Sequence, residues 1–131
     1  MNNALLAGIA VFFGGGLGAI SRYIVGLQAA KYWGILFPYG TLAINIMGSL
    51  LIGIAASYFT LYSASANQIL RLFLIVGVLG GFTTFSSFSL ETLILLQRGA
   101  FLPAISYVLL SVLVSLLMVW LGFELVKWMA Q

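Results

Sequence analysis

The sequence predicts an all-α integral membrane protein of four transmembrane helices, with the third helix broken in mid-membrane. Of its 131 residues, 63% are hydrophobic and only 5% are charged, and the mean hydropathy is +1.22. A soluble domain carries charge on about a quarter of its residues. A helix that crosses the hydrocarbon core needs about 20 mainly apolar residues, and the few charges separate tracts of that length. We therefore expect residues 1–131 to form a single four-helix membrane domain.

The first helix is expected from about Ala4 to about Leu27, with Arg22 inside its far end. It has no basic start and no small-residue cleavage site, so we interpret it as a retained span and not as a signal peptide. The segment QAAKYWGILFPYG that follows is predicted to be a loop, because its Trp33 and its tyrosines are residues typical of the membrane interface.

The second helix is expected from near Gly40 to about Tyr58 or Leu61, followed by a short connection at YSASANQ. The third tract is expected from about Gln68 to about Leu96. A turn is expected at QRGAFLP before the fourth helix, because its glycine and proline are residues that commonly mark turns. The fourth helix is expected over residues 102–127, which puts both termini on one side of the membrane.

Lys and Arg are divided almost evenly between the two ends of this bundle. Arg71 and Lys127 lie on the side of the termini, whereas Lys31 and Arg98 lie on the other, with Arg22 nearby. The bias that normally orients a membrane protein is therefore close to nil. Two oppositely oriented copies are then expected to pair as a dual-topology antiparallel homodimer, the two-chain version of an inverted repeat. A single fixed orientation is the alternative.

The inventory of reactive side chains argues against an enzyme. The chain has no cysteine and no histidine, and it has only two carboxylates. A thiolate site is excluded, and the chain has almost none of the side chains from which a metal centre or a catalytic site is usually built.

Several polar and small residues fall at membrane depth. The glycines of GGGLGAISR and NIMGSLLIG are expected to serve close helix packing. Arg22 either snorkels to the interface or faces a pore. Asn45 makes either an interhelical hydrogen bond or a ligand contact. Tyr107, Ser111 and Ser115 recur every four residues and form either a polar stripe or a row of hydroxyls bonded to their own helix.

The segment VLGGFTTFSSFSLE of the third tract combines two glycines, five hydroxyls and three phenylalanines. We expect Gly80 and Gly81 to break the helix, which is tolerated at this depth only where the freed backbone is buried or lines a cavity. Carbonyls at such a break suit a small hard cation. Hydroxyl donors and the positive edges of Phe85 and Phe88 suit a small anion that sheds its water, whereas Phe82 is expected to pack.

Three segments together resemble a known family, the fluoride channels called Fluc or CrcB. They are GGGLGAISRY at 14–23, GTLAINIMG at 40–48 and GGFTTFSSFSLE at 80–91, in order and spread over essentially the whole chain. The resemblance implies a channel in the inner (plasma) membrane that passively exports cytoplasmic fluoride. It implies an antiparallel homodimer with two pores, and a structural sodium ion at the dimer centre held by the backbone carbonyls of Gly80 and Thr83 from both copies.

The resemblance also implies roles for individual residues. It makes Asn45 a pore-lining residue, places Phe85 and Phe88 around fluoride, and makes Arg22 a marker of the pore vestibule. Further expected site residues are the hydroxyl donors Ser86 and Ser87, the polar track of Tyr107, Ser111 and Ser115, and Glu91 near a pore mouth. Val119 stands where the family's track has a fourth hydroxyl.

Two other functions fit a chain of this size. A four-helix dual-topology exporter of the small multidrug-resistance type would need a carboxylate in the first helix, where this chain has only Arg22. A non-transporting membrane subunit would explain the packing glycines but would give no reason for Asn45, the hydroxyls and the broken helix together.

Overall fold

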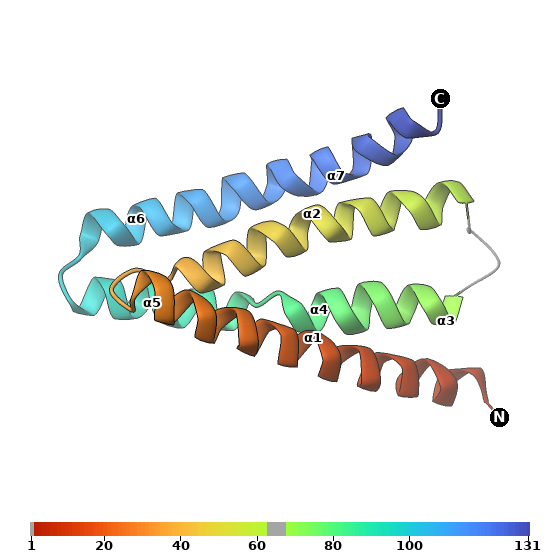
Figure 1. Ribbon diagram of the computed structural model, residues 1–131, viewed down its shortest axis with the longest axis horizontal. Helices are drawn as coiled ribbons and strands as arrows, with labels where there is room; N and C mark the ends of the chain where they lie inside the picture. The colour runs from red at the N-terminus through yellow and green to blue at the C-terminus, as the bar shows by residue number, and fades with distance from the viewer. Residues whose placement is uncertain (1, 63–67) are drawn as a thin grey trace.

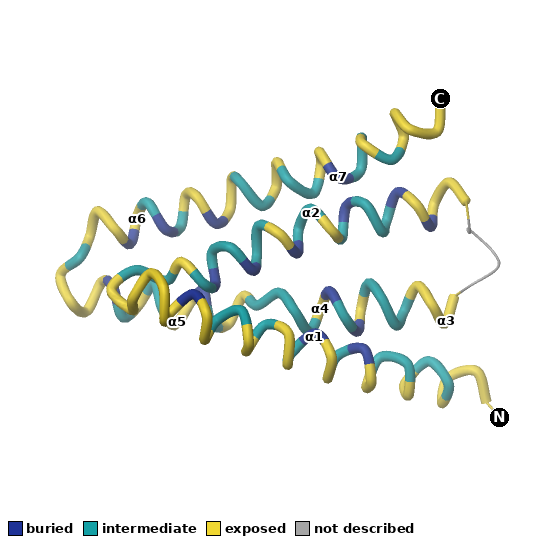
Figure 2. Tube along the Cα trace, viewed as in Figure 1, coloured by how far each residue is buried: buried dark blue, intermediate teal, exposed yellow. Residues whose placement is uncertain are grey.

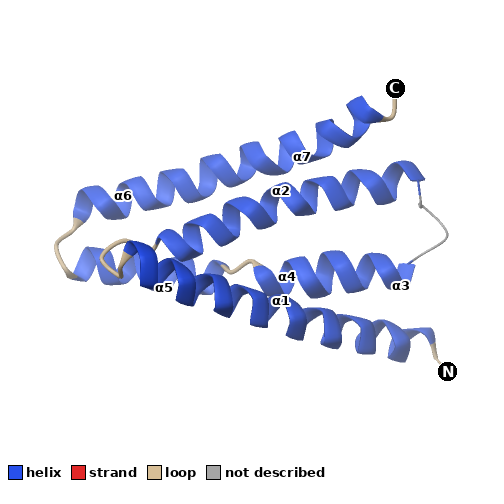
Figure 3. Cartoon of the chain, viewed as in Figure 1, coloured by secondary structure: helices blue, strands red, loops and turns tan. Residues whose placement is uncertain are grey.

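The computed structural model describes residues 2–62 and 68–131, and every regular element in those ranges is a helix (Figure 1 and Figure 3). Four helical spans are long and apolar enough to cross a membrane, which confirms the predicted architecture. The first two are α1 (Asn3–Trp33) and α2 (Tyr39–Tyr62). Both chain ends lie at the same end of the bundle, as expected for four spans.

The third and fourth spans are each composed of several helical segments. The third contains α3 (Gln68–Arg71), the π-helical η1 (Leu72–Leu79), α4 (Gly80–Phe82) and α5 (Phe85–Gln97). The fourth contains α6 (Phe101–Leu109), the π-helical η2 (Leu110–Val114) and α7 (Ser115–Met129). The connection predicted at YSASANQ falls mostly on residues 63–67, which lie outside the described residues.

The first helix is longer than the sequence predicts. It continues past Leu27 to Trp33 and ends at Gly34, whose φ of 77° is in the left-handed region and whose N–H donates to the carbonyl of Ala30. The expected long loop is therefore helical over its first six residues, 28–33. Residues such as Gln, Ala and Lys favour a helix, and glycine is the residue that readily ends one. Arg22 consequently lies about three turns inside α1 and not at its end.

Close helix packing depends on glycines, as predicted. A Cβ atom added at Gly18 would overlap the backbone carbonyl of Val78 on the third span. The other pair of spans shows the same contact in both directions, since Gly53 of α2 meets the carbonyl of Val119 and Gly122 of α7 meets that of Leu50. In lipid, such backbone contacts replace the hydrophobic driving force between helices.

The spans form two pairs, α1 with the third span and α2 with the fourth. Most residues along the bundle are exposed or half-buried (Figure 2). Four of the buried hydrophobic residues, Phe88, Leu95, Ala104 and Tyr107, form a small cluster where α5 meets α6.

The third span is broken, but not at the glycines. Gly80 and Gly81 are helical residues of α4, whereas Thr83 and Thr84 are extended, with φ and ψ of −79° and 158° and of −153° and 121°. Gly81 serves packing, because a Cβ atom there would lie 2.5 Å from the carbonyl oxygen of Gly15 on α1. The prediction of a break was right, and its position was wrong by three residues.

Candidate functional site

The break in the third span is held by the side chain of Asn45. Its Oδ1 accepts a hydrogen bond of 2.9 Å from the Thr84 N–H, and its Nδ2 donates one of 3.0 Å to the Thr84 carbonyl. One amide side chain thus satisfies both backbone groups of an extended residue at membrane depth. Asn45 makes the interhelical bond that the sequence allowed, and it also lines the central cavity described below.

This arrangement frees specific carbonyl oxygens of α4. In a continuous helix the Thr84 N–H would bond to the carbonyl of Gly80, but here it bonds to Asn45. The Ser87 N–H would likewise bond to the carbonyl of Thr83, but it donates to the Thr84 hydroxyl oxygen over 3.2 Å. The carbonyls of Gly80 and Thr83 therefore lose their helical partners, and both residues line the same cavity.

A third freed carbonyl, that of Gly81, accepts a 3.1 Å hydrogen bond from Nε of Arg22. Arg22 lies partly buried against the end of α4 and is not among the residues that line the cavity. A cation at the C-terminal end of a helix is favourable, because carbonyl dipoles point there. This hydrogen bond holds the Arg22 side chain beside the break.

The opposite end of the break is the N-terminus of α5. Thr84 caps it, since its hydroxyl oxygen accepts from the Ser87 N–H, and the same hydroxyl lies 3.2–3.3 Å from the hydroxyls of Ser86 and Ser87. Ser86 is exposed and Ser87 half-buried, and neither lines the central cavity. The N–H groups at a helix start are positively polarised and attract anions.

A central cavity of about 520 Å³ lies beside the break, between α2, α5 and the fourth span. It brings together most of the residues that the sequence singled out. The lining comprises Asn45, Ser49, Ile52, Gly80, Thr83, Thr84, Phe85, Phe88, Ser111, Val112, Ser115, Leu116 and Val119. None of these side chains is charged. Sequence reasoning missed Ser49 and Thr84 as lining residues.

The hydroxyls of Ser111 and Ser115 are buried and have no hydrogen-bonding partner within the described part of the chain. A buried polar group without a partner is costly, so such groups commonly mark a ligand or an ordered water. Phe88 is 8% exposed and Phe85 is 77% exposed, and their ring centroids are 5.4 Å apart. The cavity therefore combines unpaired donors with two aromatic rings.

Tyr107 departs from the predicted stripe. Its hydroxyl donates a 2.7 Å hydrogen bond to Glu91, whose other carboxylate oxygen accepts a 2.8 Å bond from Thr41. The π-helical segment η2 begins between Tyr107 and Ser111, and a π-helical segment changes the direction in which later side chains point. Tyr107 still contacts the cavity wall, because its ring centroid lies 5.3 Å from that of Phe88.

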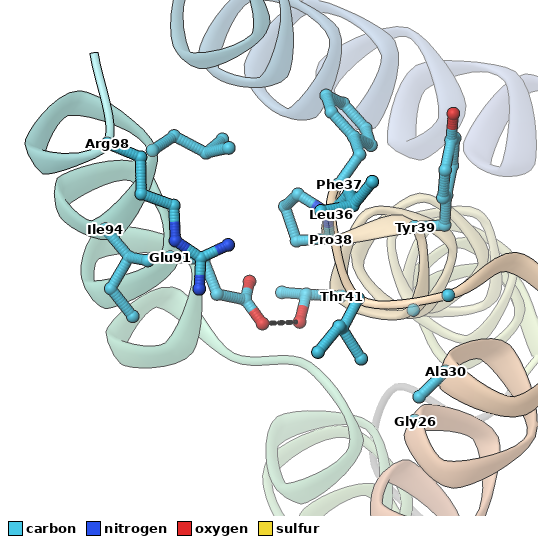
Figure 4. Close-up of a pocket in the computed structure, with 14 residues that line it drawn as sticks. Gly26, Ala30, Leu36, Phe37, Pro38, Tyr39, Thr41, Glu91, Ile94 and Arg98 are labelled. Carbon is cyan, nitrogen blue, oxygen red and sulfur yellow. Dashed lines mark hydrogen bonds between the residues drawn. The ribbon is translucent and has the colours of Figure 1, made fainter. Parts of the chain in front are cut away.

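Glu91 and Thr41 line a second cavity of about 230 Å³ at the loop end of the bundle (Figure 4). Figure 4 shows the Thr41 hydroxyl bonded to Glu91, with the guanidinium group of Arg98 facing the same space. Tyr107 connects this polar cluster of Glu91 and Thr41 to the central cavity, because its hydroxyl bonds to Glu91 and its ring contacts Phe88. Glu91 thus lies at the loop end of the bundle, and its role near a pore mouth stays a prediction.

A metal ion in this protein would be held by oxygen atoms of the backbone. Within residues 2–62 and 68–131, no group of three or more His, Cys, Asp or Glu side chains lies together. The freed carbonyls of Gly80 and Thr83 fit a hard cation such as sodium, which prefers oxygen ligands.

Comparison with known proteins gives a consistent result. Residues 9–123 match the family described as CrcB-like protein, Camphor Resistance (CrcB). The chain is 46% identical over 119 residues to the fluoride-specific ion channel FluC of Nitrobacter winogradskyi, a match that covers 91% of this chain and 94% of the relative. It is 44% identical over 127 residues to that of Rhizobium meliloti, with 97% and 98% covered. It is 47% identical over 124 residues to that of Granulibacter bethesdensis, with 94% and 96% covered.

Replacing Asn45 by alanine is expected to destabilise the break. Both backbone groups of Thr84 would lose their partner, at a cost of about 1–3 kcal/mol for each buried group. We expect a lower melting temperature in detergent and faster amide hydrogen exchange over residues 83–87. Thr60→Ala is the control, because that exposed hydroxyl bonds only to the carbonyl of Ala56 in its own helix. Unchanged exchange over residues 83–87 in the Asn45 variant would contradict the role assigned to this side chain.

Proposed function

This chain belongs to the CrcB family of fluoride channels, and we propose on that premise that it is a passive, fluoride-selective channel. The observation that carries the proposal is the central cavity. Its wall holds two buried hydroxyls with no partner in the described residues, two phenylalanine rings and an asparagine amide, without any charged side chain.

Each of these groups suits a small anion. Serine hydroxyls donate hydrogen bonds, and the Asn45 amide has a second N–H besides the one that it gives to Thr84. The edge of an aromatic ring is positive, and the start of α5 adds N–H groups at the same place. A dehydrated fluoride ion would exchange its water for these donors. Carboxylate rings, which would favour cations, are missing from the cavity wall.

A passive pathway is sufficient for the physiological task. Hydrogen fluoride is a neutral weak acid that crosses membranes and dissociates inside, so the anion accumulates in a cell that lives in an acidic medium. A selective leak lets it leave down its electrochemical gradient. The exporter alternative would need a carboxylate in the first helix, and both carboxylates of this chain, Glu91 and Glu124, lie elsewhere.

We infer that the working channel is an antiparallel dimer with two pores. Phe85 is 77% exposed and Gly80 is exposed too, so a second copy would be needed to cover this side of the break. The two ends of the bundle are alike, with Lys31 beside Tyr32 at one end and Lys127 beside Trp128 at the other. Such symmetry removes the charge difference that would fix one orientation.

A structural sodium ion at the centre of this dimer is the remaining part of the proposal. The carbonyls of Gly80 and Thr83 from both copies would hold it, since each lacks its helical partner at the break. Bound there, the cation would neutralise the partial negative charge where the two α4 helices end.

Purified protein in liposomes is expected to release fluoride rapidly, with no measurable loss of chloride, as ion-selective electrodes would record. Phe85→Ile and Phe88→Ile are each expected to slow fluoride release by about two- to tenfold, because aromatic-edge contacts are worth about 0.5–1.5 kcal/mol. We expect each variant to slow fluoride release more than it disturbs dimer assembly.

Phe12→Ile is the matched control, since Phe12 is 75% exposed on α1, similar to Phe85, but does not line the cavity. An inert wild-type protein, or one that exchanges protons for organic cations, would overturn the channel proposal. Normal flux in both Phe85→Ile and Phe88→Ile would remove only the aromatic edges from the mechanism.

Dual topology predicts that each end of the chain is found on both sides of the membrane. The chain has no cysteine, so Gln131→Cys and Gln97→Cys each introduce a single thiol, at opposite ends of the bundle. A membrane-impermeant maleimide applied to intact cells should label about half of the molecules of each variant. A fixed orientation would instead label one variant fully and leave the other unlabelled.

Removal of sodium is expected to lower stability. Protein purified and assayed with N-methylglucamine in place of sodium, at constant ionic strength, should melt several degrees lower, because an ion that binds only the folded dimer stabilises it by mass action. Returning sodium should restore the melting temperature in a saturable manner. Identical melting curves in both cations would contradict a bound structural ion.

A further inference from the structure

The cavity has a polar wall on α2 that includes one residue, Ser49, which the sequence analysis did not assign to the site. Asn45 and Ser49 are four residues apart and therefore lie on one face of the helix, and both line the central cavity. Neighbouring glycines fix the position of this face. Gly48 lies against the side chain of Thr83 at the break, and Gly53 lies against the backbone of Val119 on α7. Ser49 thus lies on α2 between the contact with the break at Gly48 and the contact with α7 at Gly53.

On the opposite wall of the cavity, formed by the fourth span, the row of hydroxyls ends at Ser115. Ser111 and Ser115 line the cavity one turn apart, and the next residue in the series, Val119, lines it as well but carries no donor. An ion that has shed its water would meet an apolar wall on α7 at this point. A charge without hydrogen-bonding partners is strongly disfavoured in such surroundings.

The Ser49 hydroxyl is available to an ion. Several other hydroxyls of the spans are already bonded to a carbonyl of their own helix, for example Thr60 to Ala56 over 2.8 Å and Thr92 to Phe88 over 2.8 Å. Ser49 is half-buried and makes no such bond within the described residues. The O–H group of Ser49 therefore remains free to donate a hydrogen bond to an ion in the cavity.

We propose that Ser49 is a conduction residue, which donates to the anion where Val119 cannot. The polar path would then pass from Ser115 on α7 to Ser49 on α2 and so avoid the apolar side chain. This inference rests on the proposed fluoride channel and adds to it a donor from the second helix. The ion would need a hydroxyl at this point between α2 and α7, and either helix could supply it.

The test compares fluoride efflux from liposomes for Ser49→Ala with that of the wild type. A hydrogen bond to a charged group is worth about 1.5–3 kcal/mol, so we expect efflux to fall by roughly ten- to a hundredfold. Ser57→Ala is the matched control, because Ser57 is a fully buried serine two turns further along α2 that does not line the cavity. Its flux should remain within about twofold of the wild type.

The double variant Ser49→Ala with Val119→Thr decides the mechanism. Threonine has nearly the shape of valine and returns a hydroxyl to the opposite wall, so efflux should recover by at least about tenfold. Wild-type efflux in Ser49→Ala would overturn the proposal, as would a defect that Val119→Thr leaves unchanged. Both results are distinct from failure of the channel function itself, which would abolish fluoride efflux in the wild-type protein.

Discussion

The double hydrogen bond between Asn45 and Thr84 is the interaction on which the rest of the site depends. At membrane depth no water is available to satisfy an open peptide group, so a helix can break only where protein atoms take over its backbone bonds. Asn45 supplies both a donor and an acceptor to one residue. The extended Thr84 and the free Gly80 carbonyl follow from this side chain on the neighbouring helix, and the Thr84 hydroxyl then caps α5 and frees the Thr83 carbonyl.

The two ends created by the break have opposite polarity. The end of α4 presents carbonyl oxygens, and the start of α5 presents N–H groups capped by Thr84. A single interruption can therefore offer a cation and an anion separate places a few residues apart. Arg22 adds to this division, because its bond to the Gly81 carbonyl satisfies one oxygen and leaves those of Gly80 and Thr83 for another partner.

The break also shows where reasoning from residue type succeeds and where it fails. A glycine pair at membrane depth predicted an interruption, but Gly80 and Gly81 remain helical because their small size serves contact with α1. The interruption falls on two threonines, whose hydroxyls bond to nearby backbone or side-chain groups. Likewise Tyr107 belongs by spacing to a stripe with Ser111 and Ser115, but its hydroxyl bonds to Glu91. Local spacing assumes a regular helix, and η2 is not one.

Composition and charge spacing alone determined that this chain has four membrane-spanning helices, because a tract of about 20 apolar residues between charges is the length that a helix needs to cross the bilayer. The motifs on three of those helices identified the family, and two of the motifs contain six of the residues that line the cavity. Only the tertiary structure decided which groups remain free to bind an ion. That property depends on where neighbouring helices place their donors and acceptors: Asn45 releases the Gly80 carbonyl, and the α2 contacts at Thr83 and Val119 place Ser49 in the cavity.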